Sequence, residues 1–114
     1  MLKSKPEEQL ELLLKELKVA RVKAVTIRQY VDSKLIKKSN YQLDFGSKFV
    51  LEWSKDLKEN KKVEKITLTV EGKDLLYYED ITVHTFQEVW SYDDGYDIQC
   101  TCKGVTSNIS ITTA

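Results

Sequence analysis

The fold of this chain depends on residues 4–38, which read SKPEEQLELLLKELKVARVKAVTIRQYVDSKLIKK. The stretch opens with the pattern of a capping box, in which we expect the Ser4 hydroxyl to accept a hydrogen bond from the Glu7 backbone N–H and the Glu7 side chain to reach back. Pro6 suits the first turn of a helix. Apolar residues then recur at three- and four-residue steps and form one stripe: Leu10, Leu13, Leu17, Ala20, Ala24, Ile27, Val31 and Leu35. The pattern predicts one long helix over about residues 5–38.

This predicted helix also has a second apolar side. At 100° per residue, four apolar or aromatic residues fall roughly opposite the core stripe: Leu12, Val19, Val22 and Tyr30. A continuous helix of about 32 residues would be roughly 48 Å long, more than the body of a domain this size. One alternative is a break between Val19 and Ile27, where β-branched residues lower helix propensity. If the helix is continuous, the second side predicts a protein-binding face.

Alternation of apolar and polar residues predicts strands after the helix. Residues 41–53, YQLDFGSKFVLEW, carry apolar side chains at odd positions and predict one strand that bends at Gly46. After a polar loop over residues 54–62, a second strand alternates through Ile66, Leu68 and Val70. A two-residue turn at Gly72 and Lys73 then leads into a third strand over residues 75–86.

Residues 90–104, WSYDDGYDIQCTCKG, predict a hairpin. We expect a three-residue loop over residues 93–95 that ends in a left-handed glycine, a conformation that costs little without a Cβ. Residues 108–113 alternate again and predict a fifth strand. The expected pairs across the hairpin are Tyr92 with Tyr96, Trp90 with Ile98 and Phe86 with Cys102.

These elements together predict an α+β fold in a single domain over residues 1–114. One long N-terminal helix, about residues 5–38, packs on a five-stranded antiparallel meander sheet, about residues 41–113. This layout resembles that of cystatin-like folds. Such a resemblance of layout implies nothing about function.

Composition narrows the class of protein. Hydrophobic residues make up 41% of the chain and charged residues 32%, with one Pro and four Gly, which favours a packed core over disorder. No apolar run approaches the roughly 18 residues that span a bilayer, and the acidic start does not resemble a secretory signal. We therefore expect a cytoplasmic protein with reduced cysteines and no membrane association.

The chain contains few residues suited to metal binding or catalysis. Cys100 and Cys102 lie two apart on a strand, so we expect thiols on one face in the core, and His84 offers no second pair of ligands for zinc. The acidic residues within 93–97 lack the spacing of a calcium loop. Nucleophile elbows, phosphate-binding glycine loops and metal-binding helix motifs are missing from the sequence. We predict no metal, no cofactor and no enzymatic activity.

Opposite charges divide the chain. Residues 1–65 hold 16 Lys and Arg against 10 Asp and Glu, net +6, whereas residues 66–114 hold 2 against 8, net −6. The two halves can attract each other within one fold, or the basic half can face an anionic partner. The second possibility gives an alternative nucleic-acid site made of eight cations: Lys15, Lys18, Arg21, Lys23, Arg28, Lys34, Lys37 and Lys38.

Taken together, these features favour a small non-catalytic protein-interaction module. We expect an adaptor, inhibitor or structural subunit, a class that includes proteins of phages and mobile elements, with another protein or a second copy as partner. Its contact surfaces would be the second side of the helix and the hairpin, where aromatic side chains beside charges resemble interface hot spots. The predicted hairpin contacts are Trp90, Tyr92, Asp93, Asp94 and Tyr96. The alternative function is nucleic-acid binding through the basic helix.

Overall fold

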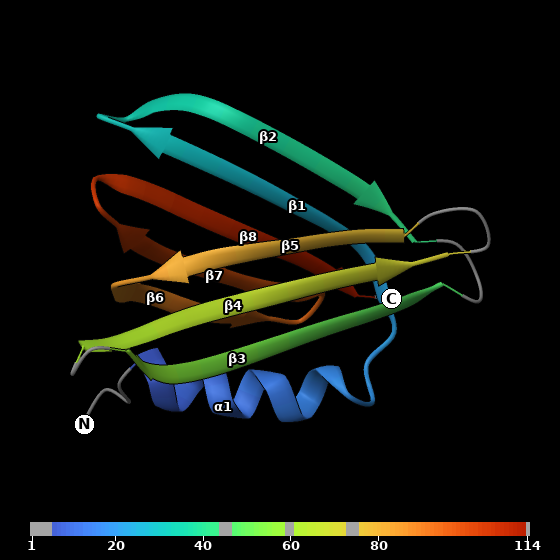
Figure 1. Ribbon diagram of the computed structural model, residues 1–114. Coiled ribbons are helices and arrows are strands. Elements are labelled where there is room, and N and C mark those ends of the chain that lie inside the picture. The colour runs from blue at the N-terminus through green and yellow to red at the C-terminus, as the bar shows by residue number, and fades with distance from the viewer. Residues whose placement is uncertain (1–5, 44–46, 59–60, 73–75, 114) are drawn as a thin grey trace.

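A computed structural model describes residues 6–43, 47–58, 61–72 and 76–113. Two antiparallel sheets account for most of the chain (Figure 1): a five-stranded sheet in the order β2-β1-β8-β7-β6 and a three-stranded sheet in the order β3-β4-β5. The elements are α1 (Pro6–Leu17), β1 (Val22–Val31), β2 (Lys34–Gln42), β3 (Lys48–Lys58), β4 (Lys61–Glu71), β5 (Leu76–Val83), β6 (Thr85–Tyr92), β7 (Gly95–Cys102) and β8 (Val105–Thr113).

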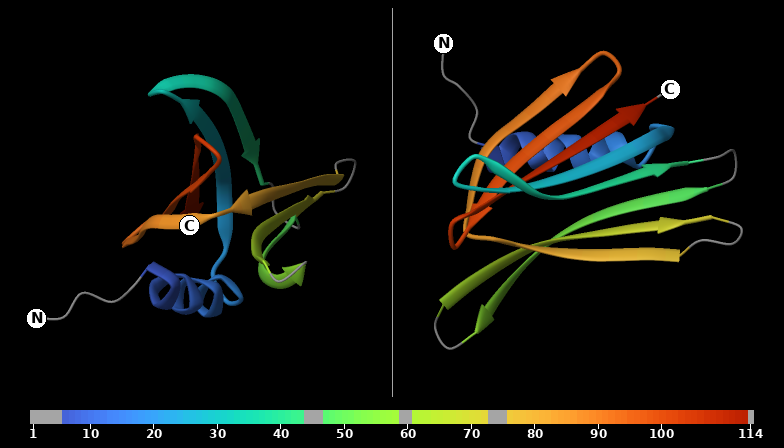
Figure 2. Two further views of the ribbon diagram at one scale, coloured as in Figure 1. Left: turned by 60° about the vertical axis from the view of Figure 1, so that its left-hand side comes forward. Right: turned by 90° about the horizontal axis from the view of Figure 1, so that it is seen from above.

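The two sheets face each other across the core, and α1 lies along one side of the pair. Figures 1 and 2 show the helix below β3 and β6, where neither sheet continues. Leu10 and Leu13 reach from α1 into the core. The remaining buried core side chains come from six strands: Val25, Ile27, Ile66, Leu68, Ile81, Val83, Phe86, Ile98, Cys100, Ile109 and Ile111.

The predicted long helix is wrong beyond Leu17. The chain leaves α1 there, and residues 22–42 form the hairpin of β1 and β2 instead. Repeated β-branched residues explain the change, because they lose side-chain freedom in a helix and fit a sheet. Asp32 and Ser33 close the hairpin with φ angles of 49° and 65°, the two positive values that a type I′ turn requires. The alternative, a break between Val19 and Ile27, correctly implied that the long helix and its second apolar side do not form.

The start of the helix agrees with the sequence prediction. Pro6 occupies the first position of α1, and Glu7 and Glu8 lie in the first turn, where acidic side chains interact favourably with the helix dipole. Ser4, the other half of the expected capping box, lies outside the described residues. Leu10 and Leu13 are 0% and 3% exposed, so the first turns of the predicted stripe do face the core.

The alternating stretch over residues 41–53 belongs to two strands in different sheets. Its first residues end β2, and the rest begins β3, whose Phe49, Leu51 and Trp53 pair with β4. Much of the expected polar loop over residues 54–62 is strand as well, because β3 extends to Lys58 and β4 begins at Lys61. The proposed bend at Gly46 and turn residue Lys73 lie outside the described residues.

A change of sheet divides the predicted third strand. β5 ends at Val83 and β6 begins at Thr85 in the other sheet. The backbone N–H of His84, between them, donates to the Thr101 carbonyl at 2.8 Å and fixes the crossing point. Alternation continues through this corner, so the sequence pattern alone predicts one strand where the structure has two.

The hairpin of β6 and β7 forms with a different register from the predicted one. Asp93 and Asp94 make a two-residue turn, Tyr92 pairs with Gly95, and Trp90 pairs with Asp97. A bulge between Phe86 and Glu88 then brings Phe86 opposite Cys100 rather than Cys102.

Gly95 serves packing rather than a left-handed turn. A Cβ added at this position would lie 2.1 Å from the backbone oxygen of Ile111, and Gly95 is not among the positive-φ residues. The close approach of β7 and β8 therefore requires a residue without a side chain. The left-handed glycine of this region is Gly104, with φ of 82°, in the turn between those two strands.

The α+β class and the antiparallel pairing are confirmed. The single five-stranded meander is wrong, because eight strands form two sheets, and the cystatin-like layout of one sheet around a long helix is wrong with it. Among the described residues, no helix is both long and apolar enough to cross a membrane.

Candidate functional site

A groove lies on the described surface between the end of α1 and β3. Its volume is about 890 Å³, within the range of roughly 300–1,000 Å³ that is typical of binding pockets. Its apolar wall consists of side chains that pack against the core without being fully covered by it: Leu14, Leu17, Val22, Leu43, Phe49 and Leu51. The groove is thus a place where the hydrophobic core is only partly covered.

The groove runs along the edge of β3. Residues 47–52 all line it, although successive side chains of a strand point to opposite faces of the sheet. What six consecutive residues share is the backbone edge of the strand. In the described part of the chain β3 pairs with β4 alone, so its other edge carries no strand partner. Backbone donors and acceptors at such an edge are available to another chain.

Basic side chains surround this apolar wall. Lys18 and Arg21 follow the helix and Lys48 begins β3, whereas Glu52 is the one acidic residue among the described residues that line the groove. Lys18 and Lys48 are exposed. The local surplus of positive charge favours an acidic occupant.

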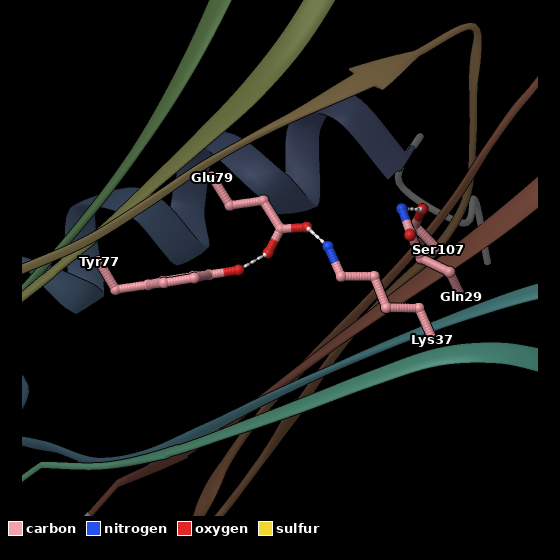
Figure 3. A network of polar contacts seen from close by, with 5 residues as sticks. All are labelled: Gln29, Lys37, Tyr77, Glu79 and Ser107. Carbon is pink, nitrogen blue, oxygen red and sulfur yellow. Dashed lines mark hydrogen bonds and ion pairs between the residues drawn. The ribbon is translucent and has the colours of Figure 1, made fainter.

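A second polar cluster joins the two sheets near β2 and β5 (Figure 3). The Lys37 ammonium lies 3.2 Å from Oε1 of Glu79, and the Tyr77 hydroxyl donates to Oε2 of the same carboxylate. The Tyr77 ring also lies against Tyr41 of β2, with ring centroids 4.1 Å apart. Glu79 is therefore satisfied from both sheets, and the cluster holds β2 against β5.

The chemistry of this cluster is that of a structural contact. Burial, followed by the hydrogen bond to Glu79, raises the pKa of Tyr77 well above its usual value. A phenol that keeps its proton is a poor base and a poor nucleophile. Nearby, the Gln29 side-chain amide donates to the Ser107 hydroxyl at 3.2 Å and satisfies another polar pair between strands.

The residues expected on the second side of the helix do not form one surface. Leu12 is exposed on α1, and Val19 follows the helix with 89% of its surface exposed. Val22 and Tyr30 lie half-buried on β1. Of the four, Val22 alone lines the groove.

The hairpin residues are brought together only in part. Trp90 and Tyr92 are 53% and 52% exposed on β6, and Asp93 and Asp94 are exposed at the turn. Tyr96 instead packs against the core, and its hydroxyl donates to Oε2 of Glu16 on α1 at 2.8 Å. Burial, then the Glu16 carboxylate, raises the pKa of Tyr96.

The basic residues of the nucleic-acid alternative are divided among several faces. Most of the segment expected to form the basic helix forms β1, a turn and β2 instead, so that structural premise is wrong. Arg28 and Lys38 pair across these strands, while Lys37 turns toward Glu79 and two cations line the groove. Lys15, Lys23 and Lys34 are exposed on α1, β1 and β2.

Cys100 is buried in the core as predicted, and Cys102 is half-buried beside it. Burial raises the pKa of the Cys100 thiol to about 12, which keeps it protonated and unreactive at neutral pH. Within the described segments, no group of three or more His, Cys, Asp or Glu side chains is placed to hold a metal ion.

The sequence pattern did not predict the groove. Its walls come from α1, the start of β1, the end of β2 and β3, and the alternation of β3 is the same whether its inner face is covered or open. Compared with protein-family models, curated proteins and solved structures, the chain matches none of them. Inference about function therefore starts from the geometry of the groove.

Proposed function

We propose that this protein is a non-catalytic module that binds another polypeptide, and that the groove between α1 and β3 is its binding site. The observation that supports the proposal is the coincidence of three features in one place: an apolar wall continuous with the core, a basic rim made by Lys18 and Lys48, and a strand edge that no other strand in the described part of the chain pairs with. Protein interfaces combine a desolvated apolar centre with a polar rim in the same way.

The lining residues favour binding over catalysis. Ser47 and Glu52 are the hydroxyl and the carboxylate at the groove, and neither histidine nor cysteine lines it. An acyl- or phosphoryl-transfer site needs a nucleophile with an adjacent base and donors aimed at a developing charge. The groove instead offers apolar surface and cations, which hold a ligand without transforming it.

The proposal is tested by reversing the charge of the rim. We expect Lys18→Glu combined with Lys48→Glu to weaken binding of the native partner at least tenfold, because two attractive contacts become repulsive. The matched control is Lys34→Glu combined with Lys38→Glu, which makes the same charge change on exposed residues of β2. Immobilised wild-type and variant proteins are exposed to nuclease-treated extract of the native host, and bound proteins are quantified by mass spectrometry.

The supporting result is a protein retained by the wild type and the control and lost from the rim variant. Identical sets of proteins on all three would refute the groove as the binding site. If retention disappears with nuclease treatment and falls steeply with salt, the nucleic-acid alternative replaces the proposal.

A further inference from the structure

We infer that the partner enters the groove as an extended strand, which pairs with the free edge of β3 and carries apolar side chains flanked by acidic ones. This inference rests on the proposed function and adds the form in which the partner is recognised. Addition of a strand to an exposed sheet edge is a common mode of peptide recognition, in which the backbone supplies affinity and alternate side chains supply specificity.

The first support is the way in which β3 lines the groove. A helix docked on an apolar groove uses side chains at three- and four-residue spacing and leaves a neighbouring strand edge unpaired. Here residues 47–52 line the hollow without interruption, so an occupant lies against the edge itself. An extended chain satisfies the backbone groups at that edge and places every second side chain toward the apolar wall of Leu14, Leu17 and Leu43.

The second support is a short uncharged run on β3. Protein edge strands are usually protected from pairing by charged residues. β3 carries charged residues at Lys48 and Glu52, and between them Phe49, Val50 and Leu51 follow one another at the groove without a charge. A partner strand can pair along this run.

The third support is charge. The exposed Lys18, just after α1, and Lys48, at the start of β3, both line the groove. Their ammonium groups attract acidic side chains of a strand bound there. Asp or Glu at the ends of its apolar segment would neutralise them, and Lys or Arg there would be repelled.

The inference is tested with a displayed library of random twelve-residue peptides. We expect selection on the wild-type protein to enrich peptides with apolar residues at every second position and Asp or Glu beside them. Binding of a selected peptide should fall at least tenfold on the Lys18→Glu, Lys48→Glu variant and stay unchanged on the Lys34→Glu, Lys38→Glu control. Circular dichroism and an unchanged unfolding midpoint confirm that both variants fold.

Two measurements then separate strand addition from other modes. N-methylation of single peptide amides should abolish binding at alternate positions and leave the intervening ones unaffected, because only every second amide faces β3. Hydrogen exchange should slow on binding at alternate β3 amides. Selected peptides with helical spacing, or an N-methylation profile without alternation, would overturn the inference, and so would a dimer of this chain through β3 that the rim variant dissociates.

The failures of the two proposals are distinguishable. If a host protein depends on the rim lysines but the selected peptides show no alternating N-methylation profile, the binding site stands and strand addition fails. If no host protein depends on the rim lysines, the proposed function itself fails, whatever the peptides do.

Discussion

The two sheets of this protein differ in how completely their inner faces are covered. In the five-stranded sheet, inner side chains of three neighbouring strands are at most 1% exposed: Val25, Ile27, Ile98, Cys100 and Ile109. The three-stranded sheet reaches this level only on its central strand, at Ile66, Leu68 and Val70, whereas Phe49, Leu51 and Trp53 of β3 stay half-buried. The two edge strands of the small sheet differ: β5 buries Ile81 and Val83 to 3% exposure, whereas the inner face of β3 is only partly covered. The partly covered face of β3 borders the proposed binding groove.

The sharpest way to break this comparison is to truncate one inner side chain on each of β4 and β3. We expect Ile66→Ala to lower the free energy of unfolding by about 3–4 kcal/mol, since a fully buried side chain loses both its transfer energy and its packing. Leu51→Ala, on the neighbouring strand, should cost about half as much, because part of that surface already faces the groove. Urea denaturation followed by tryptophan fluorescence measures both.

Equal losses at the two positions would show that β3 is sealed in solution. The two residues are suitable for comparison because both pack on the same core and belong to adjacent strands of one sheet. A bound partner should narrow the difference, since it would bury Leu51 and so raise the cost of Leu51→Ala while leaving Ile66 unchanged.

Within the five-stranded sheet, Gly95 tests how tightly the strands are packed. Gly95→Ala places a Cβ 2.1 Å from the Ile111 backbone oxygen, so β7 and β8 must separate, and we expect a loss of about 2 kcal/mol in unfolding free energy. Gly104→Ala is the matched control, because its Cβ meets nothing within 4 Å and only its positive φ is unfavourable. That conformation costs about 1 kcal/mol for alanine. A larger loss at Gly104 than at Gly95 would contradict the close approach.

The same contrast explains how much of the fold the sequence could predict. Alternation correctly predicted β4 through Ile66, Leu68 and Val70. Pro6 and the apolar spacing that begins at Leu10 correctly predicted the start of α1. Local sequence determines both features. It failed over residues 18–38, where apolar spacing satisfies a helix and a strand equally and the decision comes from pairing with β8, a segment far along the chain. Val25 and Ile27 belong to the predicted stretch yet are buried by that sheet contact.

The groove was beyond prediction for a related reason. Its walls depend on which strand became an edge and on where α1 came to lie, and neither property is local. Lys18 and Lys48 are 30 positions apart in sequence, and nothing in either neighbourhood indicates that they share a rim. The expected register put Trp90 opposite Ile98, whereas the observed register, one residue different, puts Trp90 and Tyr92 on the exposed face of the hairpin. Tyr96 lies on the inner face because it alternates with the buried Ile98 and Cys100 along β7.

The burial of Cys100 in the five-stranded sheet should be detectable as a pH dependence of the unfolding free energy. Burial raises the pKa of its thiol to about 12 from a usual value of 9, so the unfolded chain releases this proton at lower pH than the folded protein does. The contribution of Cys100 is fully present below pH 9 and declines as pH rises toward 12. Between pH 8 and pH 10 we expect the unfolding free energy to fall by about 1 kcal/mol on this account.

Cys100→Ala should remove that decline, and Cys102→Ala should retain it, because Cys102 is not fully buried. The tyrosines whose pKa values are raised begin to add to the decline as pH approaches 10, and they do so equally in both variants, so the difference between the variants isolates Cys100. Denaturation in urea at pH 8, 9 and 10 provides the comparison. An unchanged slope in Cys100→Ala would mean that another group titrates there.

The smallest expected effect concerns the contact that joins the two sheets on the side away from α1. Lys37→Met removes the ammonium from Glu79 and keeps most of the side-chain length, so the loss reports the ion pair. Because the Lys37 side chain is 52% exposed and Glu79 is 11% exposed, solvent screens the pair, and we expect a loss of about 0.5 kcal/mol at pH 7. Glu79 retains the Tyr77 hydroxyl as a partner, which limits the cost.

Lys38→Met, on the adjacent exposed residue, is the control and should change the unfolding free energy less. In 1 M salt the difference between the two variants should vanish, since screening then reaches within about 3 Å. A loss several times larger would show that Glu79 is shielded from solvent between β5 and β2. The β5 edge of the three-stranded sheet would then differ from its β3 edge more strongly than the exposed fractions of Lys37 and Glu79 indicate.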